Sequence, residues 1–287
     1  MIGTSQLINV FGAAATFDLR FLGIAGGTTG VRVNGSGYNG QGGGAGEYLE
    51  VTSLIGETGQ NYQVIVGAGG GGDTRFKTNG TQTNTFDYDI SGFSGAGYGQ
   101  SASLTESAAG SRGNSGGTTF WITGGTSDYY GGVGGGGGGA GGNGGNAKST
   151  VVFEGGSGGA GFASDITGTS ITRAGGGGGG GYTEFVSSSY LASGGSGGGG
   201  RGGLSDWNNF NNGYSAQNGT ANTGSGGGAG GYSTNFANGT GGSGIVIVRY
   251  PNTLTITVGS GLTSTTTTTG TDKVTTFTAG SDNISFT

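Results

Sequence analysis

The chain contains no cysteine and no histidine, only one proline, and few charged side chains. Without cysteine it has no disulfide framework, thiol nucleophile or zinc-thiolate site, and without histidine a Ser-His-Asp triad is impossible. Charged residues make up 9% of the chain and the formal net charge is −5, so it lacks the clustered cations that bind a phosphate backbone. We therefore expect no nucleic-acid partner.

Long apolar stretches are also missing. No run approaches the ~20 apolar residues of a membrane-spanning helix, and the N-terminus lacks a basic region followed by an apolar one. We expect no membrane insertion, no signal peptide, and synthesis in a host cytoplasm. Hydrophobic residues make up 30% of the 287 positions, which argues against a thick apolar core.

Glycine is present in large excess, with 80 residues gathered into runs. The longest runs lie at residues 131–145 and 175–181. Such runs normally indicate flexible linkers, but the segments between them contain 14 Phe, 12 Tyr and 2 Trp and argue for an ordered fold. Collagen is excluded, because it needs glycine at every third position and abundant proline.

Backbone pairing is one way to order these runs, because each non-proline residue carries one donor and one acceptor that need partners when buried. Glycine lets two backbones approach closely enough to pair. A polyproline-II-like helix of glycine, with three residues per turn, points these groups outward toward neighbouring helices. The glycine runs are then a framework rather than linkers.

Alternation of side chains predicts strands in the first third of the chain. Residues 16–24 alternate apolar and polar positions and predict a half-buried strand that runs into glycine. Residues 48–51 and 62–66 look like a second pair of strands, joined through a turn that contains Gly56 and Gly59.

The C-terminal part has a different composition. Residues 245–251 form a β-branched run that predicts a fully buried strand. Beyond it the chain is rich in threonine, and period-two stretches predict a small β-tail, with residues 263–269 as its loop.

No motif supports catalysis. G-x-G-x-x-G recurs here by composition alone, and the nearest phosphate-loop match, residues 142–149, has Ala147 where the pattern needs glycine. Asp87 and Asp89 would share one side of a strand; a calcium site or a glycosidase pair is one interpretation, and solvated acids are the one we favour. We expect no enzyme activity, no metal and no cofactor.

Aromatic side chains recur in the polar segments between glycine runs. Tyr and Trp, together with Ser, Gly and Asn, are typical of recognition loops, and aromatic faces stack on sugars. The alternative interpretation is that these rings cover the glycine framework. The candidate receptor-binding residues are Trp121, Tyr129, Tyr130, Tyr182, Phe185, Tyr190, Trp207, Phe210 and Tyr214. We place Trp207 and its Asn-rich neighbours first.

Four features together resemble the glycine-rich domains of bacteriophage tail-fibre proteins and tail-tip adhesins. They are the strand that runs into Ala25-Gly26-Gly27, the stretch 60–70, the glycine blocks, and the closing stretch 242–251. The resemblance implies a polyglycine-II helix sandwich. With the strands above, the predicted fold is mostly irregular and β: this sandwich flanked by β strands, with a small C-terminal β-tail. The predicted parts are an N-terminal attachment segment (1–15), a glycine-rich domain (16–251) and a Thr-rich β-tail (252–287).

The same resemblance implies a function and partners. It implies a virion protein of the tail or surface, whose distal loops recognise a host surface polysaccharide or an outer-membrane protein. Other virion proteins are further expected partners, and a homo-oligomer is expected, with a trimer favoured. A structural virion component without a receptor role, such as a capsid decoration or fibre subunit, is the alternative. A bacterial surface filament is a third interpretation, and low-activity lysis or glycan cleavage is a fourth.

Overall fold

The structure is a computed structural model that describes residues 14–33, 39–79, 86–91, 114–121, 132–149, 153–183, 186–206, 208–209, 211–233 and 235–287. Within these residues the regular elements are twenty β strands and one 3-10 turn, η1 (Ser188–Tyr190). No helix in this part of the chain is long and apolar enough to cross a membrane.

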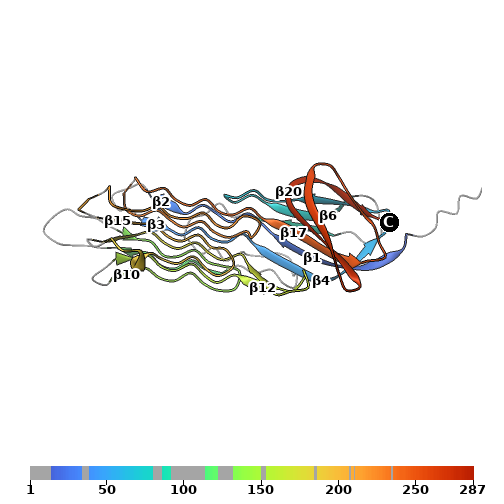
Figure 1. Ribbon diagram of the computed structural model, residues 1–287, viewed down its shortest axis with the longest axis horizontal. Helices are drawn as coiled ribbons and strands as arrows, with labels where there is room; N and C mark the ends of the chain where they lie inside the picture. Colours follow the sequence, from blue (N-terminus) through green and yellow to red (C-terminus); the bar gives the residue numbers. More distant parts are fainter. Residues whose placement is uncertain are drawn as a thin grey trace, which may run out of the picture.

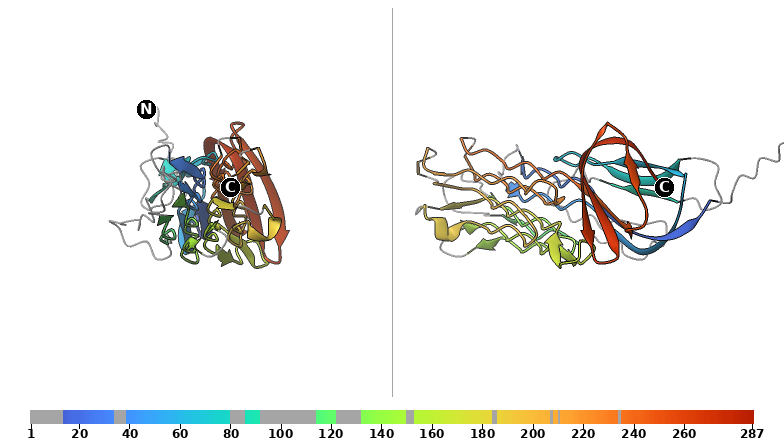
Figure 2. Two further views of the ribbon diagram at one scale, coloured as in Figure 1. Left: turned by 90° about the vertical axis from the view of Figure 1, so that its left-hand side faces the viewer. Right: turned by 45° about the vertical axis from the view of Figure 1, so that its right-hand side comes forward.

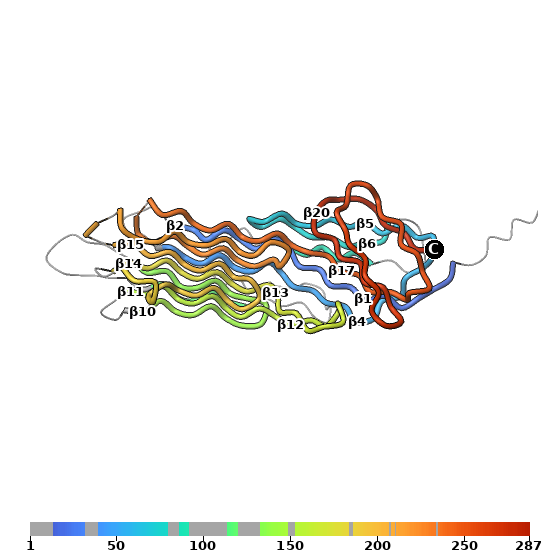
Figure 3. Tube along the Cα trace, in the orientation of Figure 1, coloured from blue at the N-terminus to red at the C-terminus, as the bar shows by residue number. Residues whose placement is uncertain are grey.

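The molecule is elongated (Figure 1). A large β-sheet forms one end, and extended glycine-rich segments run side by side from it to the other end (Figure 3). We call these segments the glycine array; they lie at residues 25–30, 42–47, 67–72, 134–147, 155–161, 174–180, 192–203, 216–231 and 237–244. We call the end of the array farthest from the large sheet the distal end.

The large sheet has nine strands and is antiparallel throughout. Its main path runs β4 (Tyr48–Glu57), β1 (Thr16–Ile24), β17 (Ile245–Pro251), β20 (Asp272–Phe286), β5 (Asn61–Ile65), β6 (Thr74–Asn79) and β7 (Asp87–Ile90). Two further strands, β18 (Ile256–Val258) and β19 (Leu262–Thr269), pair with β20.

Strand β20 joins two halves of this sheet. Its first half, from Asp272 to Phe277, pairs with β17, and its second half, from Ser281 to Ser285, pairs with β5. Gly280, at φ +101°, lies between the two halves, in a conformation that L side chains rarely adopt. The sheet therefore curls, and its two halves enclose a common core.

The core of the curled sheet is apolar and aromatic. Phe21 stacks on Phe76 with ring centroids 4.6 Å apart, and Tyr250 meets Phe286 edge-on at 4.9 Å. A second cluster, which includes Leu22, Tyr48, Ile166 and Ala140, lies where the glycine array meets the sheet. Most buried apolar side chains therefore lie in or beside the large sheet. The glycine array is stabilised mainly by its backbone.

The glycine array is joined sideways by backbone hydrogen bonds. Three consecutive glycines donate to three different neighbours: Gly176 to Gly159, Gly177 to Gly43, and Gly178 to Gly200. The next three residues, Gly179 to Gly181, return to the same neighbouring segments in the same order. A Cβ on Gly177 would overlap the carbonyl group of Gly227, so this close approach requires glycine.

The predicted fold class, a polyglycine-II helix sandwich with a small β-tail, is wrong. The described residues contain β strands and no α-helix, and their largest element is the curled nine-stranded sheet. The predicted tail strand is not peripheral, because β20 lies between β17 and β5. Apolar side chains far apart in the sequence gather into this sheet and form a core, although the hydrophobic content of 30% had argued against a thick one.

Some of the individual strand predictions are confirmed and others are wrong. The strands at 16–24 and 245–251 are confirmed as β1 and β17. Two strands are present near 48–51 and 62–66, but β4 and β5 do not pair with each other, since β4 pairs with β1 and β5 with β20 and β6. The predicted loop at 263–269 is wrong, because those residues lie in strand β19.

Smaller sheets cap the ends of the glycine array. A five-stranded sheet at the distal end runs β10 (Lys148–Ser149), β11 (Phe153–Glu154), β14 (Gly181–Thr183), β15 (Leu204–Asp206) and β16 (Gly213–Tyr214). The pairs β2 (Val31–Val33) with β3 (Asn39–Gln41), and β8 (Phe120–Trp121) with β9 (Gly132–Val133), make two further ladders. The pair β12 (Phe162–Ser164) and β13 (Ile171–Arg173) lies beside the large sheet.

Candidate recognition surface

An exposed aromatic ring lies at the distal end of the molecule. Tyr214, on strand β16, is 38% exposed, and the guanidinium carbon of Arg201 lies 5.9 Å from the centre of its ring. Arg201 also donates from Nη2 to the carbonyl oxygen of Ser215 at 3.4 Å, which holds the guanidinium near the ring. A cation over an aromatic face is attracted by the ring quadrupole. The pair offers a ligand both a ring and hydrogen-bond donors.

The Asn-rich loop after β15 is held by one carboxylate. Asp206 Oδ1 accepts hydrogen bonds from the backbone N–H groups of Asn208 at 2.8 Å and Asn209 at 3.2 Å. Its Oδ2 accepts from Nδ2 of Asn212 at 3.2 Å. Asp206 is 8% exposed, while the three asparagines are exposed, so a nearly buried acid fixes a loop of accessible amides.

A second loop joins this one through side-chain amides. Asn235 donates from Nδ2 to Oδ1 of Asn211 at 2.8 Å. The two residues are distant in sequence, so the bond ties the turn before the last glycine segment to the loop after β15. We define the distal surface as Arg201, Tyr214, Asn208, Asn209, Asn211, Asn212 and Asn235.

Of the nine predicted receptor-binding residues, Tyr214 is the one whose ring the structure shows to be exposed. Tyr190 lies in η1 and is half-buried. The side chain of Trp121, in β8, lies outside the described part of the structure, as do the whole residues Tyr129, Tyr130, Phe185, Trp207 and Phe210. The preferred candidate, Trp207, is thus flanked by described residues but is not itself among them.

The expectation that Tyr182 lies in an accessible recognition loop is corrected by the structure, because this residue is 5% exposed and lies within β14. Its ring stacks on Phe153 at 5.0 Å and tilts against Tyr232 at 5.7 Å. Burial, with a smaller contribution from Tyr232, raises the pKa of the Tyr182 phenol to about 12. This ring is part of the small core that supports the five-stranded sheet.

Sequence reasoning missed the partners that complete the distal surface. Arg201 was not among the candidates, and its contact with Tyr214 depends on β15 and β16 pairing beside a glycine segment. Asn235 carried no signal of its contact with Asn211. The Asn-rich composition of residues 206–212 was the one sequence feature that pointed to this region.

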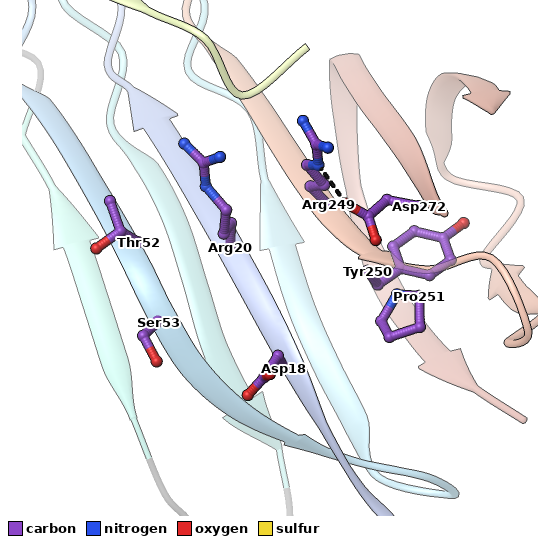
Figure 4. Close-up of a pocket in the computed structure, with 8 residues that line it drawn as sticks. All are labelled: Asp18, Arg20, Thr52, Ser53, Arg249, Tyr250, Pro251 and Asp272. Carbon is purple, nitrogen blue, oxygen red and sulfur yellow. Dashed lines mark hydrogen bonds and ion pairs between the residues drawn. The ribbon is translucent and has the colours of Figure 1, made fainter. Parts of the chain in front are cut away.

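A polar pocket of about 350 Å³ lies on the large sheet (Figure 4), away from the distal end of the molecule (Figure 1). Its lining residues are Asp18, Arg20, Thr52, Ser53, Arg249, Tyr250, Pro251 and Asp272. The arginines are already engaged: Arg20 pairs with Asp165 at 2.7 Å and Glu50 at 3.3 Å, and Arg249 pairs with Asp272 at 2.7 Å.

The Arg20–Asp165 ion pair fastens the loop after β12 to the large sheet. The hydrogen bond and charge of Arg20 hold the pKa of the Asp165 carboxyl below its usual range. Beside them, Glu50 accepts hydrogen bonds from the hydroxyls of Tyr48 and Ser164, both at 2.9 Å, which joins β4 to β12. We interpret the pocket as a joint between the array and the sheet.

The other sequence candidates for chemistry have structural roles. Asp89 pairs with Arg75, and Asp87 lies opposite Lys77 in the ladder of β7 and β6. Lys148, the phosphate-loop candidate, pairs with Glu154 at 3.3 Å across the β10–β11 ladder. Among the described residues no group of three or more acidic side chains is placed to hold a metal ion.

Comparison with known proteins gives one finding. The profile of a protein family described as a glycine-rich domain matches residues 8–251, which includes the whole glycine array and strands β1 to β17. Neither the curated proteins nor the solved structures compared with the chain gave a match.

Proposed function

The chain belongs to the glycine-rich domain family, and from this premise we propose that it is a bacteriophage virion protein that recognises a host surface structure through its distal surface. The phage assignment is supported by the sequence resemblance to tail-fibre and tail-tip adhesins. The protein acts by binding and carries out no catalytic step.

One observation supports the receptor role: an exposed tyrosine ring, an arginine and several exposed asparagine amides are gathered at one end of an elongated, hydrogen-bonded array. The glycine array separates the distal surface from the large sheet, and its sideways hydrogen bonds engage each segment in several directions. A rigid support reduces the conformational entropy lost when loops bind a partner. The large sheet, at the opposite end, is left for attachment to other virion proteins.

The chemistry of the distal surface favours a polysaccharide as the receptor. Exposed asparagine amides both donate and accept hydrogen bonds, which matches sugar hydroxyl groups. The exposed face of Tyr214 matches the apolar face of a sugar ring, and Arg201 adds further donors. An outer-membrane protein is the other class of receptor that such a surface fits.

The direct test measures adsorption of the purified full chain to host cells and to isolated host polysaccharide. We expect Arg201→Ala with Tyr214→Ala to weaken binding at least tenfold, because central aromatic and arginine residues contribute most of the energy of interfaces. Trp207→Ala with Phe210→Ala tests the neighbouring segment. The control is Thr255→Ala with Thr257→Ala, at exposed positions near or on β18 of the large sheet. Unchanged adsorption of both the Arg201 and Tyr214 variant and the Trp207 and Phe210 variant contradicts the proposal.

A structural virion component is the second candidate, and the extensive backbone bonding of the array favours it because a stiff rod suits a spacer. The two candidates differ in copy number. An adhesin is present in a few copies per particle, and a capsid or shaft subunit in many. Quantitative mass spectrometry of purified virions distinguishes them.

A further inference from the structure

Strand β19 forms an open edge of the large sheet. It pairs with the first half of β20, and the described residues place no strand on its other side. Residues 263–268 are all exposed, so neither face of the strand is covered. Seen along the long axis, the β19–β20 hairpin lies at the margin of the molecule (Figure 2).

An open edge leaves half of a strand's backbone donors and acceptors free to pair with another strand. Folded proteins usually protect such edges with charges, bulges, or very short strands. The other edges of this sheet have these devices. Strand β7 carries Asp87 and Asp89, β18 is three residues long, and β4 carries Glu50 and a register shift against β1.

Strand β19 has little of this protection: its one register shift against β20 lies between Thr263 and Ser264, at the start of the strand, and the pairing from Ser264 to Thr269 is regular. Its sequence from Leu262 to Thr269 contains no charged residue, no proline and no glycine. Seven consecutive positions are serine or threonine, and threonine has a high β propensity. The contact of Gly168 with Thr269 lies at the end of the strand and leaves residues 263–268 accessible.

We propose that β19 is a homodimerisation edge, which pairs antiparallel with β19 of a second copy of this chain about a twofold axis. The identity of the partner follows from self-complementarity. A twofold interface uses the same patch on both copies, so a charged strand would place like charges near each other, whereas this one is neutral. With the axis at Thr266, residues 263–269 of one copy run opposite residues 269–263 of the other, and each hydroxyl side chain lies opposite another hydroxyl side chain.

The pairing continues the sheet from one copy into the next. Cross-strand Thr–Thr contacts stabilise such a ladder, and the free backbone groups of β19 gain partners. In such a dimer the edge of each copy is paired with the edge of the other, so neither edge remains free for a third copy. This pairing therefore gives neither a cyclic trimer nor an open fibre.

The test compares two matched variants of the full chain by sedimentation velocity. Thr265→Lys with Thr267→Lys places two like charges on each edge, and we expect it to sediment as a monomer while the unmodified chain is a dimer. Thr255→Lys with Thr257→Lys makes the same change in charge at the same spacing near and on β18, and stays a dimer. Circular dichroism establishes that all three are folded.

A cysteine scan tests the register independently, because the chain has no cysteine of its own. Single variants from Thr263→Cys to Thr268→Cys are oxidised mildly. We expect disulfide-linked dimers to be most abundant at one central position and to decline toward both ends, with none for Thr255→Cys. A monomeric or trimeric unmodified chain, a dimer that survives the Thr265 and Thr267 lysine substitutions, or no cross-linking at any position overturns the proposal.

Discussion

Arg20 on β1 and Arg249 on β17 lie directly opposite each other in the antiparallel ladder of the large sheet. Like charges at such positions repel and destabilise a sheet. Each guanidinium has its own acid, Asp165 for Arg20 and Asp272 for Arg249. Asp165 lies in the loop after β12. The carboxylate that fastens this loop to the large sheet therefore also offsets the repulsion between the two arginines.

Asp165→Asn should lower the stability of the protein at neutral pH and have less effect in acid. The arginine lowers the pKa of Asp165, so its carboxylate stabilises the fold above the unfolded-state pKa of about 4, and this contribution is lost as the pH falls through the lower folded-state value. Asp165 is largely exposed, so we expect a cost of about 0.5 kcal/mol.

Urea unfolding of the unmodified chain and the variant over a range of pH measures this difference. Asp18→Asn is the control, since Asp18 lines the same pocket but forms no ion pair among the described residues. A difference between Asp165→Asn and the unmodified chain that stays constant down to the acid limit contradicts the assignment.

Two neighbouring glycines should respond differently to alanine. A Cβ on Gly43 would overlap the carbonyl group of Thr28, whereas a Cβ on Gly44 has its nearest neighbour, the hydroxyl of Thr28, at 3.9 Å. Gly43→Ala should therefore lower the free energy of unfolding by about 1–3 kcal/mol through overpacking. Gly44→Ala should change the free energy of unfolding by less than about 1 kcal/mol. An increase is consistent with this expectation, because alanine has less conformational freedom than glycine in the unfolded chain. Chemical denaturation of both variants measures the two free energies of unfolding. Equal decreases in the two variants would show that close packing around Gly43 does not determine the effect of the substitution.

Asp206→Ala should loosen the distal loop without unfolding the protein. The carboxylate accepts the backbone N–H groups of Asn208 and Asn209, and loss of a comparable cap costs about 0.5–2 kcal/mol. We expect the amides of these two residues to exchange with deuterium faster while those of β17 stay protected. Exchange at Asn208 and Asn209 that is the same in both proteins rules out a capping role.

Tyr182→Phe should change the alkaline limit of stability. Because burial raises the pKa of the Tyr182 phenol from about 10 in the unfolded chain to about 12, its contribution is complete below pH 10 and is lost as the pH rises toward 12. The variant should lose less stability over that interval than the unmodified chain. Thermal unfolding at several alkaline pH values measures the slope, with the exposed Tyr214→Phe as the control. Identical slopes for all three proteins argue against burial of this phenol.

Local sequence patterns determined some of the strands. Alternation across residues 16–24 and the β-branched run at 245–251 specify strands, because the apolar side chains that are buried in each strand lie within the segment itself. The same patterns did not specify partners, so β4 and β5 were paired wrongly. The threonines of β19 were assigned to a loop because an exposed strand has no apolar face to produce a period of two.

The glycine content by itself determined that the interior of the array consists of backbone, because residues without side chains have little else to bury. Only the tertiary structure decided which segment bonds to which, since a run of identical residues carries no signal of register. It also decided that Tyr182 is buried while Tyr214 is exposed, and that Arg201 meets Tyr214. Those outcomes depend on contacts between segments distant in sequence, which are formed only when the strands and glycine segments are packed together.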